Sequence, residues 1–508
     1  MMPSTMAFSP TAAVRDSSRR WMEGPLTTVI IDDDALGDLS SEIARAMMRP
    51  SGGTSSSGTS GAAAAVTEWD AEGWHYDGSG YRGRESSRME RVALYVLSLD
   101  AINFCFWPDV EAGDGDVDGD GDGRCGAVAA KTTKTKTTTR NSLEYEHLAI
   151  ALRKVAEADD ENDDDENDDV ENDVDVDVAV VRSGPSYALG PANLSTLTPS
   201  RLRSLLRPHF PSPTTGEEDV AAAVGGRYYD LPNVEVRCAL LNELGRGLLD
   251  RHDGSALRMI SKANGSADAL VGIILDTFPG FRDYCVDASS IPASDGWEAA
   301  RGGGGSASIV HFYKRAQIAV ADLWAALGRR HRGSIESPDA SSNDYLTRMC
   351  RFDDICLLTT FPDYRVPQIL RRTGALRYDP RLAGMVDGRR TLERGGVDEI
   401  SIRAGTVVAV EDIVRRVREE ILKGVGVVPT KTTKTTTTAA AVADDGGDGG
   451  DAEGRSRDDD DDGYRHRLRA IADDVSAVTI DWYLWQRGER LDRANSLGEH
   501  HRVITTFY

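Results

Sequence analysis

The stretch 361-FPDYRVPQ-368 places one acid between an aromatic residue and a Tyr-Arg pair. It follows the apolar run 355-ICLL-358 and precedes a segment with helical periodicity. Asp363 can cap that helix, since aspartate is a favoured N-cap residue. The same position also allows its carboxylate to leave bulk water and face a ligand. On this stretch alone capping is the simpler interpretation, so the choice depends on residues elsewhere in the chain.

Most of the patterned sequence is helical in period, with apolar residues three or four positions apart. The expected helices span 34–48, 88–106, 143–156, 199–206, 234–249, 267–278, 312–327, 366–376, 410–422 and 464–491. Strand-like alternation is brief and is clearest at 308–312 and 399–402. The sequence therefore predicts a mainly α protein, a single large helical domain with a minor β element.

Low-complexity tracts interrupt these segments. Their Gly/Asp, Lys/Thr and acidic compositions bury too little apolar surface to offset the entropy of ordering. We expect disordered insertions at about 50–66, 111–140, 157–180 and 429–462. One tract begins like a calcium loop at Asp116, but Ala127 stands where such a loop needs a bidentate glutamate. No metal site is therefore expected there.

The 508 residues carry a net charge of −24, most of it in these tracts. An acidic chain argues against direct binding to DNA or intact tRNA, which requires a basic surface. The 6 cysteines include no CxxC pair, which disfavours a zinc site and fits a reducing compartment. We see no secretory signal and no run of membrane-spanning length, so we expect a cytoplasmic protein. Serine and arginine within 1–20 leave organellar import open.

No Walker loop, GxGxxG turn, HExxH helix or GxSxG elbow is present, so chemistry must depend on carboxylates, aromatics and one histidine. Polar groups mix with large aromatics in four stretches, 74-WHYD-77, 99-LDAINFCFWPD-109, 361-FPDYRVPQ-368 and 480-IDWYLWQ-486. Each also has a structural explanation. Asp100 and Asn103 can satisfy buried backbone groups, and His75 alone fits a structural histidine.

Taken together, these stretches resemble the queuosine salvage proteins, a family of queuosine 5′-phosphate N-glycosylase/hydrolases. The resemblance covers 12–508, apart from the insertions, and is strongest in SLDAINFCFWPD, LLNELGRGLL, KANGSADALVGIILDTFPGFRD, HFYKRAQIAVADLW, FPDYRVPQIL and IDWYLWQ. It implies hydrolysis of the N-glycosidic bond of queuosine 5′-monophosphate to queuine and ribose 5-phosphate, for queuine salvage to tRNA modification. It implies no cofactor, and a fold like the helix-hairpin-helix DNA glycosylases without their DNA-binding function.

The resemblance also implies roles for individual residues. The aspartate of the family's F-x-D-Y-R motif is its catalytic carboxylate, which is Asp363 here. The positions that contact the queuine base are His75, Phe361, Asp481, Trp482 and Gln486. Gln486 departs from the aspartate of some members, so an amide hydrogen bond replaces an ionic contact at that position.

The chemistry of the bond agrees with these residue types. A ribosyl C–N bond breaks through a sugar with oxocarbenium character, which a fixed carboxylate near C1′ stabilises. The same carboxylate can instead attack C1′ or take a proton from water. Position 7 of the base is carbon and cannot be protonated like N7 of guanine, so hydrogen bonds must spread the leaving charge. Asp481 suits the N1–H and amino donors, and Phe361 and Trp482 can sandwich the ring.

The 5′-phosphate requires cations. The candidates are Lys314, Arg315, Arg365 and Lys262. Arg365 can instead pair with Asp363.

Two alternative functions stay open at this point. A nucleobase-excision glycosylase acting on DNA is disfavoured by the acidic balance, and a non-catalytic queuine-binding protein is disfavoured by the intact Phe361/Asp363 pair.

Overall fold

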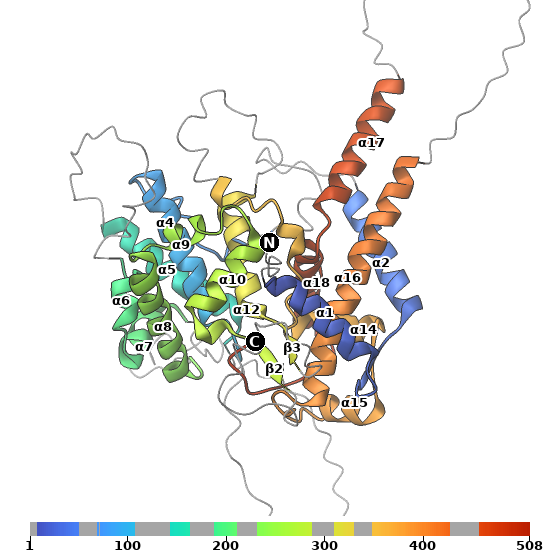
Figure 1. The fold of residues 1–508 in the computed structure, drawn as a ribbon, viewed down its shortest axis with the longest axis horizontal. Helices are drawn as coiled ribbons and strands as arrows, with labels where there is room; N and C mark the ends of the chain where they lie inside the picture. Colours follow the sequence, from blue (N-terminus) through green and yellow to red (C-terminus); the bar gives the residue numbers. More distant parts are fainter. Residues whose placement is uncertain are drawn as a thin grey trace, which may run out of the picture.

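The computed structural model describes residues 8–49, 69–70, 72–106, 143–162, 187–210, 231–286, 309–329, 348–426 and 457–508. This part is mainly helical, as predicted, and its helices form two groups (Figure 1). The group on the left comprises α4 (Glu85–Ala101), α5 (Tyr145–Asn162), α6 (Pro191–Ser195), α7 (Pro199–Leu206), α8 (Val234–His252), α9 (Ala256–Ser261), α10 (Ala267–Thr277) and α12 (Lys314–Leu323). The group on the right comprises α1 (Pro10–Glu23), α2 (Asp33–Met48), α14 (Arg365–Thr373), α15 (Pro380–Asp387), α16 (Val397–Gly426), α17 (Arg457–Asp474) and α18 (Ala477–Arg493).

The β structure consists of two short antiparallel pairs. Strand β1 (Val29–Ile31) pairs with β4 (Leu376–Tyr378), and β2 (Tyr284–Val286) pairs with β3 (Ile309–His311). The remaining turns of helix are 3-10 segments at Arg207–His209, Pro279–Phe281 and Ile355–Leu357, and a π turn at Trp324–Gly328. The strand expected at 308–312 is confirmed as β3.

Each helix group has an apolar core of its own. The left core includes Leu244 and Ile274, and the right core includes Leu36 and Ile413, all of them buried. Phe361 and Trp482 come from segments of the right group but pack in the left core. These two aromatic side chains therefore lie where the two groups meet.

Several helix boundaries agree with the sequence. Helix α7 has the predicted bounds, and α2 and α10 each differ from the prediction by one residue at one end. Helix α4 ends at Ala101 rather than at 106, which leaves 103–106 outside the helix. Helix α14 ends at Thr373 and is capped by Gly374, whose left-handed φ of 85° suits glycine, so Leu376 lies in β4 rather than in the helix.

Two element predictions were wrong. The strand expected at 399–402 lies in α16, because Ile400, Ala404 and Val407 are buried at helical spacing. The single helix expected at 464–491 is divided into α17 and α18. Ser476 and Thr479 form a capping box that starts the second helix.

The expected insertions at 50–66 and 111–140 lie outside the described residues, as do most of 157–180 and 429–462. Residues 157–162 and 457–462 are described and are helical, in α5 and α17, so the prediction of disorder was wrong for these residues. The calcium-loop-like tract also lies outside the described ranges. None of the helices in the described part of the chain combines the length and hydropathy that crossing a bilayer requires.

Candidate active site

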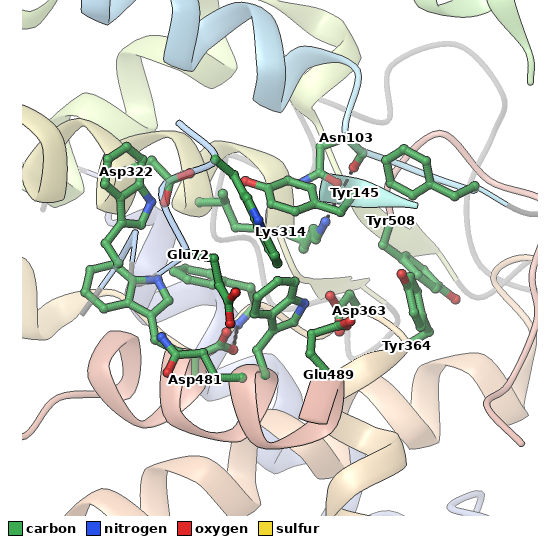
Figure 2. Close-up of a pocket in the computed structure, with 18 of the residues that line it drawn as sticks. Glu72, Asn103, Tyr145, Lys314, Asp322, Asp363, Tyr364, Asp481, Glu489 and Tyr508 are labelled. Carbon is green, nitrogen blue, oxygen red and sulfur yellow. Dashed lines mark hydrogen bonds between the residues drawn. The ribbon is translucent and has the colours of Figure 1, made fainter. Parts of the chain in front are cut away.

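A cavity of about 1190 Å³, its open mouth included, lies at the junction of the two helix groups. Its walls come from residues 69–70 and 72–75, the segments 103–106 and 361–364, and helices α5, α12 and α18. Figure 2 shows how side chains from these distant segments converge. The predicted site residues that line it are His75, Lys314, Phe361, Asp363, Asp481, Trp482 and Gln486. The structure therefore collects the proposed catalytic and base-binding residues around one space.

Asp363 is held at the start of α14. Its Oδ1 accepts hydrogen bonds from the backbone N–H groups of Arg365 (2.8 Å) and Val366 (3.3 Å). The capping interpretation is therefore correct for this oxygen. Oδ2 accepts no hydrogen bond from the part of the chain that the structure describes. One oxygen thus fixes the carboxylate while the side chain lines the cavity.

Lys314 is the first residue of α12 and is 97% buried, with 3% of its surface exposed. Its Nζ donates to the backbone oxygen of Asn103 (3.4 Å). Burial lowers the pKa of Lys314 below its ordinary value. The nearby carboxylates of Asp363 and Asp100 offset part of this shift. Figure 2 shows Lys314 and Asp363 directed into the same cavity. A buried cation therefore lies beside the candidate catalytic carboxylate.

Asp481 projects from the first turns of α18. Its Oδ2 accepts the backbone N–H of Phe361 (2.9 Å) and the hydroxyl of Thr360. Burial, and secondly the negative charge of Asp363, raise the pKa of Asp481 to about 7. Because this carboxyl group is tied to the backbone before Asp363, helix α18 and the 361–364 segment keep a fixed relation.

Neighbouring side chains hold the aromatic residues that are predicted to contact the base. Trp482 stacks on Trp324 with ring centroids 5.9 Å apart and an angle of 18° between the planes. The guanidinium of Arg329 lies over both rings, 5.2 Å and 5.6 Å from their centroids. Phe361 is buried in the left core. Both side chains are therefore held rigidly at the cavity wall.

His75 is also fixed by its neighbours. Its Nδ1 lies 2.8 Å from Asp70 Oδ1, and its Nε2 lies 2.9 Å from the hydroxyl of Tyr145. The imidazole ring stacks on Trp69 with centroids 4.3 Å apart. Gln486 lines the same cavity one helical turn after Trp482. Both ring nitrogens of the histidine already have protein partners.

The model of the queuosine salvage protein family matches residues 203–508, more than half of the chain. The chain belongs to this family. A queuosine 5′-phosphate N-glycosylase/hydrolase from Dictyostelium discoideum is 27% identical over 440 residues, which are 87% of this chain and 85% of that protein. A protein of the same name from Sphaerobacter thermophilus is 28% identical over 291 residues, 57% of this chain and 62% of the relative. One from Mus musculus is 34% identical over 194 residues, 38% of this chain and 47% of the relative.

The family match contains most of the cavity but not all of it. Asp363 and Asp481 lie within 203–508, whereas His75 precedes that range. The predicted domain bounds of 12–508 stay a prediction. The likeness to helix-hairpin-helix DNA glycosylases likewise stays a prediction.

Three cations proposed for the phosphate do not line the cavity. Arg315 donates to backbone carbonyls. Arg365 places Nε 2.7 Å from Glu489 Oε1. Lys262 donates to a backbone carbonyl 2.7 Å away. Each of these positive charges is used within the protein, so Lys314 is the member of the predicted set that the cavity contains.

The sequence interpretation missed several cavity residues. Asp322 follows Lys314 and Ile318 at a spacing of four along α12, and all three line the cavity. That spacing was a usable signal, because residues four apart share one face of a helix. Tyr145 and Tyr508 come from distant segments and had no comparable signal in the sequence.

One acidic group near the cavity has the geometry of a cation site. Carboxylate oxygens of Glu144, Glu146 and Glu489 lie within 4.8 Å of one another. Glu489 is already paired with Arg365. Burial raises the pKa of Glu489 to about 7, and the two neighbouring glutamates add to that effect. We assign no metal to this group.

Proposed function

We propose that this chain hydrolyses the N-glycosidic bond of queuosine 5′-monophosphate, releasing queuine and ribose 5-phosphate for queuine salvage to tRNA modification. Membership of the queuosine salvage family and the names of its relatives support the reaction. The observation that carries the proposal is the single cavity that contains Asp363, Lys314, Asp481 and two rigid aromatic rings.

In this proposal the base occupies the middle of the cavity. Phe361 and Trp482 contact its faces, and the stack of Trp482 on Trp324 holds that surface in place. The ionised carboxylate of Asp481 accepts the N1–H and the exocyclic amino group. Gln486 completes the polar contacts of the base, and His75, whose ring nitrogens both have protein partners, contributes its ring to the cavity wall. These interactions spread the negative charge that the base takes as it leaves.

Asp363 acts on the sugar. Its capping bonds orient the carboxylate without using Oδ2, so a negative charge is fixed before the substrate arrives. A preorganised charge of this kind stabilises the positive charge that develops at C1′ without reorganisation cost. Lys314 supplies the cation for the phosphate, from a position in the same cavity as Asp363.

The reaction acts on a free nucleotide rather than on nucleic acid. The chain carries a net charge of −24, and several carboxyl groups line the cavity, so a polyanion is disfavoured. We also keep a cytoplasmic location and the absence of a cofactor as parts of the proposal.

The direct test is incubation of the full-length protein with queuosine 5′-monophosphate, followed by chromatography. We expect queuine and ribose 5-phosphate in equal amounts. Asp412→Asn, on the exposed face of α16, is the matched control and should react like the unaltered protein. Tight binding of queuine with no release from the nucleotide would favour the non-catalytic alternative and overturn the proposal.

A further inference from the structure

One end of the cavity has a continuous aromatic wall. The rings of Trp74 and Trp485 meet edge to face with centroids 5.9 Å apart, and Tyr145 meets Trp485 in the same way at 5.8 Å. The ring centroids of His75 and Tyr145 are 5.9 Å apart, and the His75 ring stacks on Trp69. All five residues line the cavity. Phe361 and Trp482 already cover both faces of a flat base. The base alone therefore does not account for this additional aromatic wall.

A carboxyl group lies within this aromatic end. Asp322 lines the cavity, has only 4% of its surface exposed, and accepts the indole N–H of Trp69. Figure 2 shows Asp322 on the opposite side of the cavity from Asp363 and Tyr364. Asp322 is therefore too remote from the sugar end to share the role of Asp363.

Acidic side chains are crowded around Asp322. Asp100 on α4 is fully buried beside it, and Lys314 and His75 are the nearby groups that favour its ionised form. Burial, and then the charge of Asp100, raise the pKa of Asp322 well above its ordinary value. Lys314 is shared with Asp363 and Asp100. Asp100 and Asp322 therefore share Lys314 with Asp363. A positively charged ligand group would supply a further cation at this end of the cavity.

We propose that Asp322 and the surrounding rings of Trp69, Trp74 and Trp485 bind the protonated secondary amine that joins the queuine base to its cyclopentenediol. Aromatic faces with a carboxylate are the usual surroundings of a bound ammonium group. The inference rests on the proposed function for the identity of the ligand. It adds a subsite that reads the substituent at position 7.

The order of groups along the cavity agrees with the shape of the substrate. The sugar is attached at N9 and the amine-bearing arm at C7, so they leave the five-membered ring in diverging directions. Asp363 and Asp322 lie on opposite sides of the cavity (Figure 2), so a base bound near Asp481 can direct its sugar toward Asp363 and its arm toward Asp322. This arrangement makes Asp322 a specificity-determining residue that selects the modified base over an unmodified deazaguanine.

The test compares two small ligands that differ in one group, 7-aminomethyl-7-deazaguanine and 7-hydroxymethyl-7-deazaguanine. By calorimetry we expect the unaltered protein to bind the amine at least about thirtyfold more tightly than the alcohol, the range of a charged hydrogen bond. In Asp322→Asn the two affinities should come within about threefold of each other, with the alcohol affinity unchanged. Asp412→Asn, outside the cavity, should keep the full difference.

Proton release provides a readout that a merely structural role would not change. Burial raises the pKa values of both Asp322 and its neighbour Asp100, so an ammonium ligand that ionises Asp322 should release one proton. Calorimetry in two buffers of different ionisation enthalpy should show about one proton released with the amine and none with the alcohol. Asp322→Asn should abolish the release.

Equal affinities of the unaltered protein for the amine and the alcohol would overturn the proposed subsite. So would an Asp322→Asn variant whose affinity for the two ligands falls by the same factor. If that variant does not fold, Trp485→Leu decides, because it should weaken the amine more than the alcohol. An equal effect on both ligands would contradict the inference. None of these measurements requires hydrolysis, so failure of the subsite is distinct from failure to cleave queuosine 5′-monophosphate.

Discussion

The two oxygens of Asp363 have different surroundings, and this explains why one residue fits two interpretations. Oδ1 accepts two backbone N–H groups at the start of α14. Asp363→Ala should therefore lower the free energy of unfolding by about 1 kcal/mol, the usual value of an N-cap, whereas Asp363→Asn should retain most of it. Denaturant unfolding of the two variants measures the difference. Equal stability of the two would show that the cap contributes nothing.

Asp481 gives the site a pH dependence at the residue scale. Its pKa of about 7 means that the group is partly protonated near neutrality, whereas the base requires the anion. The affinity for 7-deazaguanine, which has no arm to engage Asp322, should rise about tenfold per pH unit below that value and level off above it. Asp481→Asn should make the profile flat. A flat profile in the unaltered protein would contradict the assigned role.

At the scale of elements, helix α16 positions two of the site segments through one buried ion pair. Arg403 donates to the backbone oxygen of Pro362 (3.0 Å) and to Asp283 Oδ1 (2.9 Å). Asp283 Oδ2 accepts the backbone N–H of Lys314 (3.2 Å). The ion pair therefore joins the backbone next to Asp363 to the start of α12.

Arg403→Met should destabilise the protein by about 3–5 kcal/mol, because it leaves the buried carboxylate of Asp283 without its partner. It should also lower kcat, since the 361–364 segment loses an anchor. Arg415→Met, on the exposed face of the same helix, is the matched control and should change stability by less than about 0.5 kcal/mol. Thermal or denaturant unfolding and turnover assays check both. Similar stabilities of the two variants would refute the anchoring role.

Element boundaries show what the sequence pattern contains and what it lacks. Apolar periodicity predicted α2, α7 and α10 closely, because each begins at a good capping residue. It continued across α17 and α18, since the break depends on a capping box whose third helical residue is Thr479 rather than a glutamate. The alternation at 399–402 resembled a strand because it was too short to reveal the helical period of α16.

For the whole molecule, buried acids predict how stability changes with pH. Burial raises the pKa of Glu90, Asp481 and Glu489 to about 7 and that of Asp100 to about 8. The folded state thus binds more protons than the unfolded chain, so stability falls as pH rises through these values. Histidines with lowered pKa contribute little above about pH 7.5, because they are then almost entirely neutral in both states.

We therefore expect the melting temperature to decrease between about pH 6.5 and pH 8.5. Glu90→Gln should reduce that slope, because Glu90 is fully buried and accepts three hydrogen bonds at the start of α9. Thermal unfolding monitored by circular dichroism across this range provides the measurement. A melting temperature that rises over the range would be inconsistent with neutral buried acids.

Site residues that belong to a distinctive local motif could be predicted from the sequence. Site residues whose role depends on which side chain they contact in the folded protein could not. Asp363, Asp481 and Trp482 lie in distinctive aromatic stretches, and the structure brings them together. Arg315 and Arg365 carry the right charge for a phosphate, but backbone carbonyls and Glu489 occupy their guanidinium groups. No local pattern indicates which partner a buried cation finds.

The central claim is that the Asp363 carboxylate acts on the breaking glycosidic bond. The most direct measurement is turnover of queuosine 5′-monophosphate by Asp363→Asn, together with its affinity for queuine. The account predicts a fall in kcat of at least about a thousandfold, with the queuine affinity within about threefold of the unaltered protein. Turnover above about a tenth of normal, or an equal loss of queuine binding, would contradict it.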